Sequence, residues 1–206
     1  MIWGRKRNLL LGTNVVELLL PQRRPFLMVD IVESFEAGDQ PALEASRFIS
    51  MNEEIFSGHF PGLHLWPGSL TMEGLGQTSA LLITILGLRR AAEARGADPE
   101  SALEPLRNLE LGFHLHPGYR SQDIAEFAAQ LRPMGARIAV GAAVEVKLLR
   151  PVFAGQRLDY RAVLVREVGD MMRFECEACV EEVPVATGRL TGALVIRPMP
   201  PEPPVT

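Results

Sequence analysis

Two residues of this sequence, His59 and Glu73, have side chains suited to proton transfer at neutral pH. His59 lies in a loop rich in Gly and Pro, residues 58–68, where backbone groups can approach a ligand closely. From Ser69 the apolar residues recur with helical spacing, so Glu73 falls in the first turns of a helix that Ser69 or Thr71 can cap. A histidine can remove a proton, and a carboxyl group partly removed from water can hold one and donate it. Because amides at a helix start can also hold an oxygen that becomes negative, the pattern favours proton transfer beside a thioester.

Four ordered blocks of the sequence resemble one enzyme family, the hot-dog-fold (3R)-hydroxyacyl-acyl carrier protein dehydratases. The blocks are Leu20-Pro21-Gln22-Arg23-Arg24-Pro25-Phe26-Leu27-Met28-Val29-Asp30, Asn52-Glu53 before Phe56, His59-Phe60-Pro61-Gly62 with Pro67-Gly68 and Glu73 to Gln77, and Arg150-Pro151-Val152 with Gly155. The family has L-P-H-R-x-P-F-L-L-V-D, N-E-P-F-F, G-H-F-P-G followed by P-G and E-A-x-A-Q, and R-P-V-x-P-G-D at these places. The resemblance covers residues 13–90 and 136–197. Four blocks in the same order are far more specific evidence than a single His-Phe-Pro-Gly motif would be.

The resemblance implies roles for individual residues. His59 would be the catalytic base and Glu73 the acid. Three further residues would support them: the Gly68 amide would bind the thioester oxygen, the Leu65 carbonyl would fix the tautomer of His59, and Gln77 would orient the site. The substrate pocket would include Phe60, Pro61, His64 and Trp66. The expected reaction turns a (3R)-hydroxyacyl thioester into a trans-2-enoyl thioester and water, with no cofactor and no metal.

The resemblance also implies partners. In the family each pocket lies between two subunits, so we expect a homodimer or a trimer of dimers. The substrate would arrive on acyl carrier protein, in fatty acid biosynthesis or a related acyl or polyketide pathway. Because carrier proteins are usually acidic, Arg23, Arg24 and Arg150 are candidates for a basic patch that binds one.

The sequence departs from the family on the helix and in the loop. The helix motif reads Glu73-Gly74-Leu75-Gly76-Gln77, and each helical glycine costs roughly 1 kcal/mol relative to alanine while permitting close packing. His64 stands where the family usually has Pro, and Trp66 where an aliphatic residue or Met is common. The branch that also isomerises the double bond usually has Asp in place of Glu73, which favours plain dehydration. Two alternatives stay open: a hot-dog acyl thioesterase, which would not need His59, and a non-catalytic acyl-binding or partner subunit.

The composition predicts one domain that binds neither nucleic acid nor membrane. The 206 residues are 47% hydrophobic, enough for a substantial core, and the formal net charge of −4 gives no reason to expect a nucleic-acid partner. No apolar run approaches the roughly 18 residues that cross a bilayer. The apolar run after the basic residues 5–7 is shorter than a signal-peptide core of about 7–15 residues. We therefore expect a cytoplasmic protein.

Cys176 and Cys179 form a C-x-x-C pair, a spacing that occurs in metal and redox sites. Apolar and polar residues alternate through this segment, however, which favours a strand with the two thiols on opposite faces. No second cysteine pair completes a zinc site.

The hydrophobic patterns predict an α+β fold, a single hot-dog domain over residues 1–197. Asn14 and Glu17 make a capping box for a short helix that Pro21 ends. Strands are expected at about residues 26–36, 42–50, 137–149, 157–167, 171–181 and 185–197. The helix that starts at Ser69 should end before Gly96. It is apolar over much of its circumference, so a curved antiparallel sheet wrapped around it is the simplest way to bury it.

Residues from about 91 to 135 are an insertion relative to the family. Short helices are expected at residues 99–103 and after Ser121, with an extended segment between them that carries His114 and His116 on one side. That spacing can bind a metal, although solvent-facing histidines are the commoner explanation. We interpret the insertion as a lid or wall of the acyl pocket, and residues 198–206 as a disordered Pro-rich tail.

Overall fold

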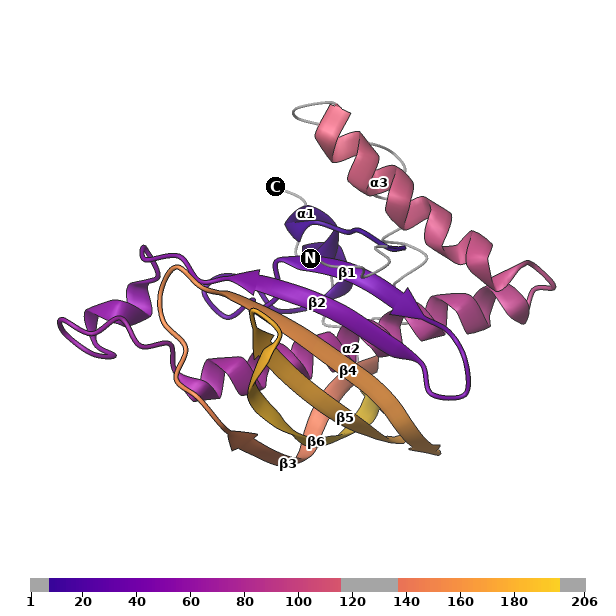
Figure 1. Ribbon diagram of the computed structural model, residues 1–206. Helices are drawn as coiled ribbons and strands as arrows, with labels where there is room; N and C mark the ends of the chain where they lie inside the picture. The colour runs from indigo at the N-terminus through magenta and orange to yellow at the C-terminus, as the bar shows by residue number, and fades with distance from the viewer. Residues whose placement is uncertain (1–7, 116–136, 197–206) are drawn as a thin grey trace, which may run out of the picture.

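The computed structural model describes residues 8–115 and 137–196. Within these ranges the strands form one antiparallel sheet in the order β1-β2-β4-β5-β6-β3 (Figure 1). The strands are β1 (Ile31–Glu36), β2 (Ala42–Phe48), β3 (Arg137–Leu148), β4 (Arg157–Val168), β5 (Met171–Val180) and β6 (Val183–Ile196). Consecutive pairs such as β4 and β5 are hairpins, and Gly169 takes a left-handed φ of 60° in the turn between them.

The predicted strands are present, but the first begins later than expected. β1 starts at Ile31 rather than near Phe26, because the Phe26 carbonyl and the Met28 amide bond the side chain of Gln77 instead of a neighbouring strand. The segment before β1 therefore attaches to the central helix, which matters for the site described below.

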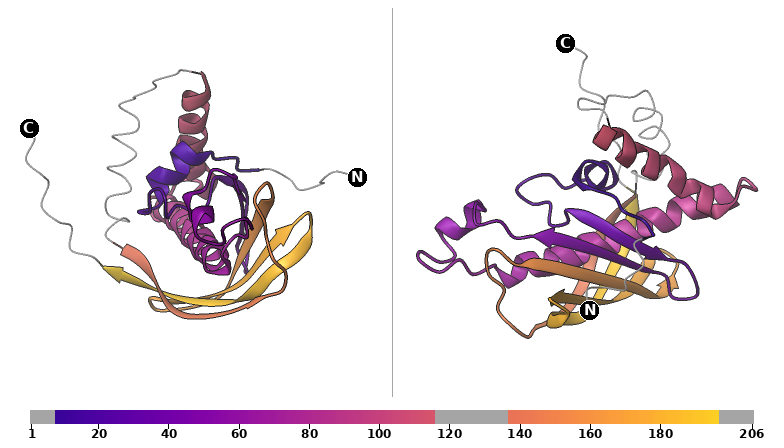
Figure 2. Two further views of the ribbon diagram at one scale, coloured as in Figure 1. Left: turned by 90° about the vertical axis from the view of Figure 1, so that its left-hand side faces the viewer. Right: turned by 45° about the horizontal axis from the view of Figure 1, so that its top comes forward.

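The central helix, α2 (Gly68–Glu93), runs along the inside of the curved sheet. Figure 2 shows the strands bending around it like a trough. Leu75, Leu81, Leu82 and Ile85 are fully buried, and polar residues such as Thr78 are buried as well. Because the helix is covered on most sides, its side chains need no single apolar stripe. The prediction of a sheet that wraps a long helix is confirmed.

The strands pack on α2 through alternating side chains. In β5, Met172, Phe174 and Cys176 are buried whereas the residues between them are exposed. The Cys176 Sγ lies 3.6 Å from the Ser79 Oγ on α2, and burial raises the pKa of this thiol to about 11. The C-x-x-C pair thus belongs to a strand, as predicted, and both cysteines are buried.

Helices outside the sheet differ more from the expectation. α1 (Thr13–Leu19) forms, but no side chain caps it, so the predicted capping box is wrong. Instead, the Gly12 amide at its start donates to the Glu110 carboxylate, 2.7 Å away. Glu110 belongs to α3 (Glu104–Leu115), which projects beside α1 (Figure 1). A carboxylate distant in sequence therefore accepts from the amide at the helix start, the role that Glu17 has in the predicted capping box.

The expected extended segment around His114 is helical. After the 3-10 helix η2 (Pro99–Leu103), α3 continues through Leu115, because its buried residues recur with helical spacing at Leu106, Leu109 and Gly112. His114 Nε2 lies 2.7 Å from Glu110 Oε1, one turn away. The expectation that His114 lies in an extended segment, on the same side as His116, is therefore wrong as far as His114 is concerned. His116, the helix expected after Ser121 and the tail lie outside the described residues.

None of the helices in the described ranges has both the length and the apolar character that crossing a bilayer requires.

The contact between α2 and β4 depends on a glycine. A Cβ atom on Gly74 would lie 2.4 Å from both the Cζ and the hydroxyl oxygen of Tyr160, far inside van der Waals contact. Tyr160 is fully buried, so its ring has no free space to enter. Burial also raises the pKa of its hydroxyl, which stays neutral. A Cβ on Gly76, by contrast, would meet no heavy atom of the described chain within 4 Å.

The two helical glycines should therefore respond oppositely to alanine. Gly74→Ala is expected to lower the free energy of unfolding by about 1–3 kcal/mol through overpacking against the tyrosine ring. Gly76→Ala, the matched control, is expected to raise it by up to about 1 kcal/mol through helix propensity. Denaturant unfolding followed by circular dichroism measures both, and a Gly74→Ala protein as stable as Gly76→Ala would show that the contact carries no strain.

Candidate active site

His59 lies in the loop between the 3-10 helix η1 (Glu54–Ser57) and α2. Its amide donates to the Ile55 carbonyl at 2.9 Å, and its Nδ1 lies 2.9 Å from the Leu65 carbonyl oxygen. A carbonyl only accepts hydrogen bonds, so Nδ1 carries the proton and the neutral ring leaves Nε2 unprotonated. The ring therefore has the tautomer that a general base with Nε2 as its acceptor requires.

The loop after His59 is fixed to the segment that follows β3. Leu65 forms an isolated β-bridge with Phe153, and the Trp66 amide donates to the Val152 carbonyl at 2.8 Å. The Ala154 amide donates in turn to the His64 carbonyl at 3.1 Å. The Arg-Pro-Val block near the end of the sequence thus holds in place the carbonyl that orients His59.

The four residues expected to line a pocket have different surroundings. The His64 ring packs edge-on against Phe56, with centroids 5.6 Å apart, and Trp66 contacts the same phenylalanine at 6.2 Å. Trp66 is buried beneath the loop, whereas Phe60 and Pro61 are exposed. Trp66 therefore supports the loop from below, and Phe60, whose ring stacks on His59, faces outward.

Helix α2 starts at Gly68 without a side-chain cap, so the expected cap from Ser69 or Thr71 is wrong. The reason is that the Leu70 and Thr71 amides are both satisfied by the Pro67 carbonyl. Within the described residues, the Gly68 and Ser69 amides donate no hydrogen bond. Two free amides at the positive end of the helix dipole form a ready site for an oxygen that gains negative charge.

Glu73 is held by Gln77 one turn later on α2. Gln77 Nε2 donates to Glu73 Oε1 at 2.9 Å and to the Phe26 carbonyl at 2.7 Å, while Gln77 Oε1 accepts from the Met28 amide at 2.7 Å. Gln77 is only 1% exposed. Because all three contacts use one rigid amide group, the backbone before β1 fixes the rotamer of Gln77 and thereby the position of the carboxyl group.

The predicted site residues thus form two groups. One contains His59 and Leu65 on the loop, and the other contains Glu73 and Gln77 on the helix, with Gly68 between them in sequence. No hydrogen bond or ion pair joins His59 to Glu73 within the described part of the chain. The backbone of Phe26 and Met28 was not anticipated as part of the site, although the block that contains it resembles the family and was the available signal.

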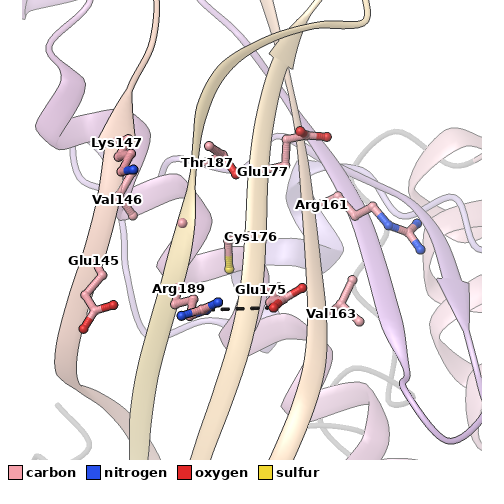
Figure 3. Close-up of a pocket in the computed structure, with 11 residues that line it drawn as sticks. Glu145, Val146, Lys147, Arg161, Val163, Glu175, Cys176, Glu177, Thr187 and Arg189 are labelled. Atoms are coloured by element: carbon pink, nitrogen blue, oxygen red, sulfur yellow. Dashed lines mark ion pairs between the residues drawn. The ribbon is translucent and has the colours of Figure 1, made fainter.

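An open hollow of about 830 Å³ lies elsewhere, on the outer face of the sheet (Figure 3). Its walls are cross-strand pairs of charged residues, such as Arg189 with Glu175 at 3.9 Å, and it contains none of the predicted site residues. Such pairs are what a solvated sheet face carries. We therefore do not assign the acyl pocket to this hollow.

Comparison with known proteins identifies the part of the chain that carries the site. Residues 20–102 match the family model of the FabA-like domain. This segment is therefore similar to a FabA-like domain. The 3-hydroxyacyl-[acyl-carrier-protein] dehydratase FabZ of Aeromonas hydrophila is 44% identical over 79 residues, which are 37% of this chain and 52% of the relative. FabZ of Vibrio atlanticus is 48% identical over 71 residues, 34% of this chain and 46% of the relative. The chain spans about half the length of the curated relatives it matches.

The fold has a relative among solved structures. The dehydratase heterocomplex ApeI:P from Xenorhabdus doucetiae matches with a TM-score of 0.51 and 14% sequence identity, over 87% of this chain and 90% of that one. The hot-dog fold is therefore confirmed, and so is the resemblance of the FabA-like segment to FabZ dehydratases.

The Gln77 contacts predict a stability effect that can be separated from any catalytic one. Gln77→Leu leaves the buried Met28 amide and the partly buried Phe26 carbonyl without these partners, which should lower the free energy of unfolding by about 2–4 kcal/mol. Ser79→Ala is the matched control, because Ser79 is also buried on α2 but its hydroxyl bonds a helix carbonyl that keeps its own partner. It should cost less than about 1 kcal/mol. If urea titrations show the same loss of unfolding free energy in both variants, the Gln77 contacts do not stabilise the protein as predicted.

Proposed function

We propose that this protein dehydrates a (3R)-hydroxyacyl thioester on acyl carrier protein to a trans-2-enoyl thioester, in fatty acid biosynthesis or a related acyl pathway. The observation that carries the proposal is the hydrogen bond from His59 Nδ1 to the Leu65 carbonyl, which leaves Nε2 free to accept a proton. The similarity of residues 20–102 to FabZ dehydratases supports the same reaction.

The proposed chemistry assigns one task to each group. His59 Nε2 removes the proton from C2 of the substrate, and the electron pair moves toward the thioester carbonyl. The free Gly68 amide, at the positive end of α2, stabilises the enolate oxygen. Glu73, held by Gln77, donates a proton to the C3 hydroxyl, which leaves as water as the double bond forms. The proton on His59 then returns to Glu73, directly or through water, and restores both groups.

Replacing either proton-transfer residue should abolish most of the activity. His59→Ala and Glu73→Gln are each expected to lower kcat by about 100- to 10,000-fold, the usual contribution of a general acid or base. The assay is mass spectrometry of a 3-hydroxyacyl group on acyl carrier protein. His114→Ala is the matched control, because this histidine lies on α3 and contacts Glu110 rather than the site.

The same assay separates the alternatives. Release of free acid by wild type and by His59→Ala alike would support a thioesterase and overturn the proposal. Binding of the acyl carrier protein with neither water nor acid released, across a range of chain lengths, would instead indicate a non-catalytic subunit.

We also propose that two copies of the chain form the active dimer by pairing along β3. This strand is at the end of the sheet order, and its side chains Val144 and Leu148 are 56% and 54% exposed. A long, apolar free edge normally requires a partner. Leu148 also lies against Gly68, so a copy paired on β3 would adjoin the start of α2. Such an arrangement would bring His59 of one copy toward Glu73 of the other.

A shared site can be tested by mixing two inactive variants. A heterodimer of His59→Ala and Glu73→Gln chains, purified through two different tags, should regain about half the wild-type rate, because one of its two sites contains both intact residues. Homodimers of each variant, carried through the same purification, are the control. A heterodimer as inactive as the homodimers would mean that each site uses residues of a single chain.

Acyl carrier protein is the partner that this function requires. Arg23 donates to the carbonyls of Leu20 and Gln22, and Arg150 donates to the Pro184 carbonyl. No carboxylate pairs with Arg23, Arg24 or Arg150 in the described part of the chain, so their charges remain available to an acidic partner.

A further inference from the structure

A buried arginine on β2 lies between the two groups of site residues. Arg47 is 8% exposed. Its Nη1 donates to the Leu27 carbonyl at 2.9 Å and to Asp30 Oδ1 at 3.1 Å, and its Nη2 donates to Glu53 Oε1 at 2.6 Å. The guanidinium carbon also lies 5.6 Å from the centroid of the Trp66 ring, over its face. One side chain therefore joins the segment before β1, the start of η1 and the end of the His59 loop.

The first of these contacts leads to the acid. Leu27, whose carbonyl accepts from the guanidinium, stands between Phe26 and Met28 in the chain. The backbone of these two neighbours binds the amide of Gln77, which in turn donates to Glu73. Three hydrogen-bonded steps and one short stretch of backbone thus connect the arginine to the carboxyl group.

The other contacts lead to the base. Glu53 directly precedes η1, and the Ile55 carbonyl of this turn accepts from the His59 amide. Trp66, on the far side of the loop, directly follows Leu65, whose carbonyl orients the imidazole. The guanidinium therefore contacts the residue before η1 and the end of the loop that carries His59.

We infer that Arg47 is a positioning residue that holds the base and the acid in one frame; this inference rests on the proposed dehydratase function. A planar guanidinium can donate in several fixed directions while it stacks on an aromatic ring, whereas an ammonium cannot reproduce that geometry. Burial of the charge is compensated by Asp30 and Glu53, so removal of the arginine leaves two carboxylates without their cation. Arg47 acts through the groups it holds.

The test compares Arg47→Lys and Arg47→Met with Arg161→Met. Arg161 is a matched control, because it also bridges two carboxylates, Glu44 and Glu36, each at 3.0 Å, but on the outer face of the sheet. Arg47→Lys keeps the charge and remains informative if Arg47→Met does not fold. Both Arg47 variants are expected to lower kcat by about ten- to a hundredfold with little change in KM, as expected when reacting groups are misplaced. Arg161→Met should keep kcat within about twofold of wild type.

Hydrogen exchange of the full-length protein supplies a readout that does not depend on activity. In both Arg47 variants the amides of Met28 and His59 should exchange faster than in wild type, because Arg47 holds the segment that contains Met28 and the turn whose Ile55 carbonyl accepts from His59. In Arg161→Met both should remain protected. If wild type fails to dehydrate the substrate but both amides lose protection in the Arg47 variants, the proposed function is wrong. The inference that Arg47 holds the two groups together is then still supported. Unchanged protection at either amide, or an unchanged kcat in an active enzyme, would overturn the inference.

Discussion

Burial of α2 is the constraint on which the rest of the structure depends. The helix is buried on most of its sides, and no flat sheet could cover it. A six-stranded sheet that bends around it removes both the helix and the concave face of the sheet from water. Most of that burial is unspecific, and side chains of similar size could replace one another. The contact at Gly74 is different, because the Tyr160 ring occupies the volume that any side chain would need.

The start of this buried helix is where chemistry becomes available. A helix surrounded by protein over most of its length still has unsatisfied amides at its first turn. Here the loop that precedes it is held away by contacts with Val152 and Ala154, so the Gly68 amide stays free. The same helix carries Glu73 one turn further on, and the same loop carries His59. Fold and chemistry are thus linked by the position of a single helix terminus.

Buried polar side chains give the site its precision. Gln77 and Arg47 are both nearly inaccessible to water, and both use their hydrogen bonds on the backbone of residues 26–28. An unpaired amide or guanidinium in such a place would be costly, so these contacts fix one geometry rather than several. Three of the departures of this chain from the dehydratase family that it resembles, two helical glycines and Trp66 in the loop, are close in sequence or in space to these contacts. Trp66 contributes an aromatic face for the guanidinium.

The sequence by itself determined the elements and the residue types of the site. Periodicity of the side chains predicted α2 and the strands, since repeats of 3.6 and 2 residues arise from local backbone geometry. Motif spacing predicted His59, Glu73 and their supporting residues as site residues through the resemblance. The failures share one cause. The cap of α1 comes from Glu110, the first strand is shortened because residues 26–28 bind Gln77, and residues 111–115 are helical because α3 buries one of its faces. Each of these outcomes depends on a partner distant in the sequence, which only the tertiary structure brings into contact.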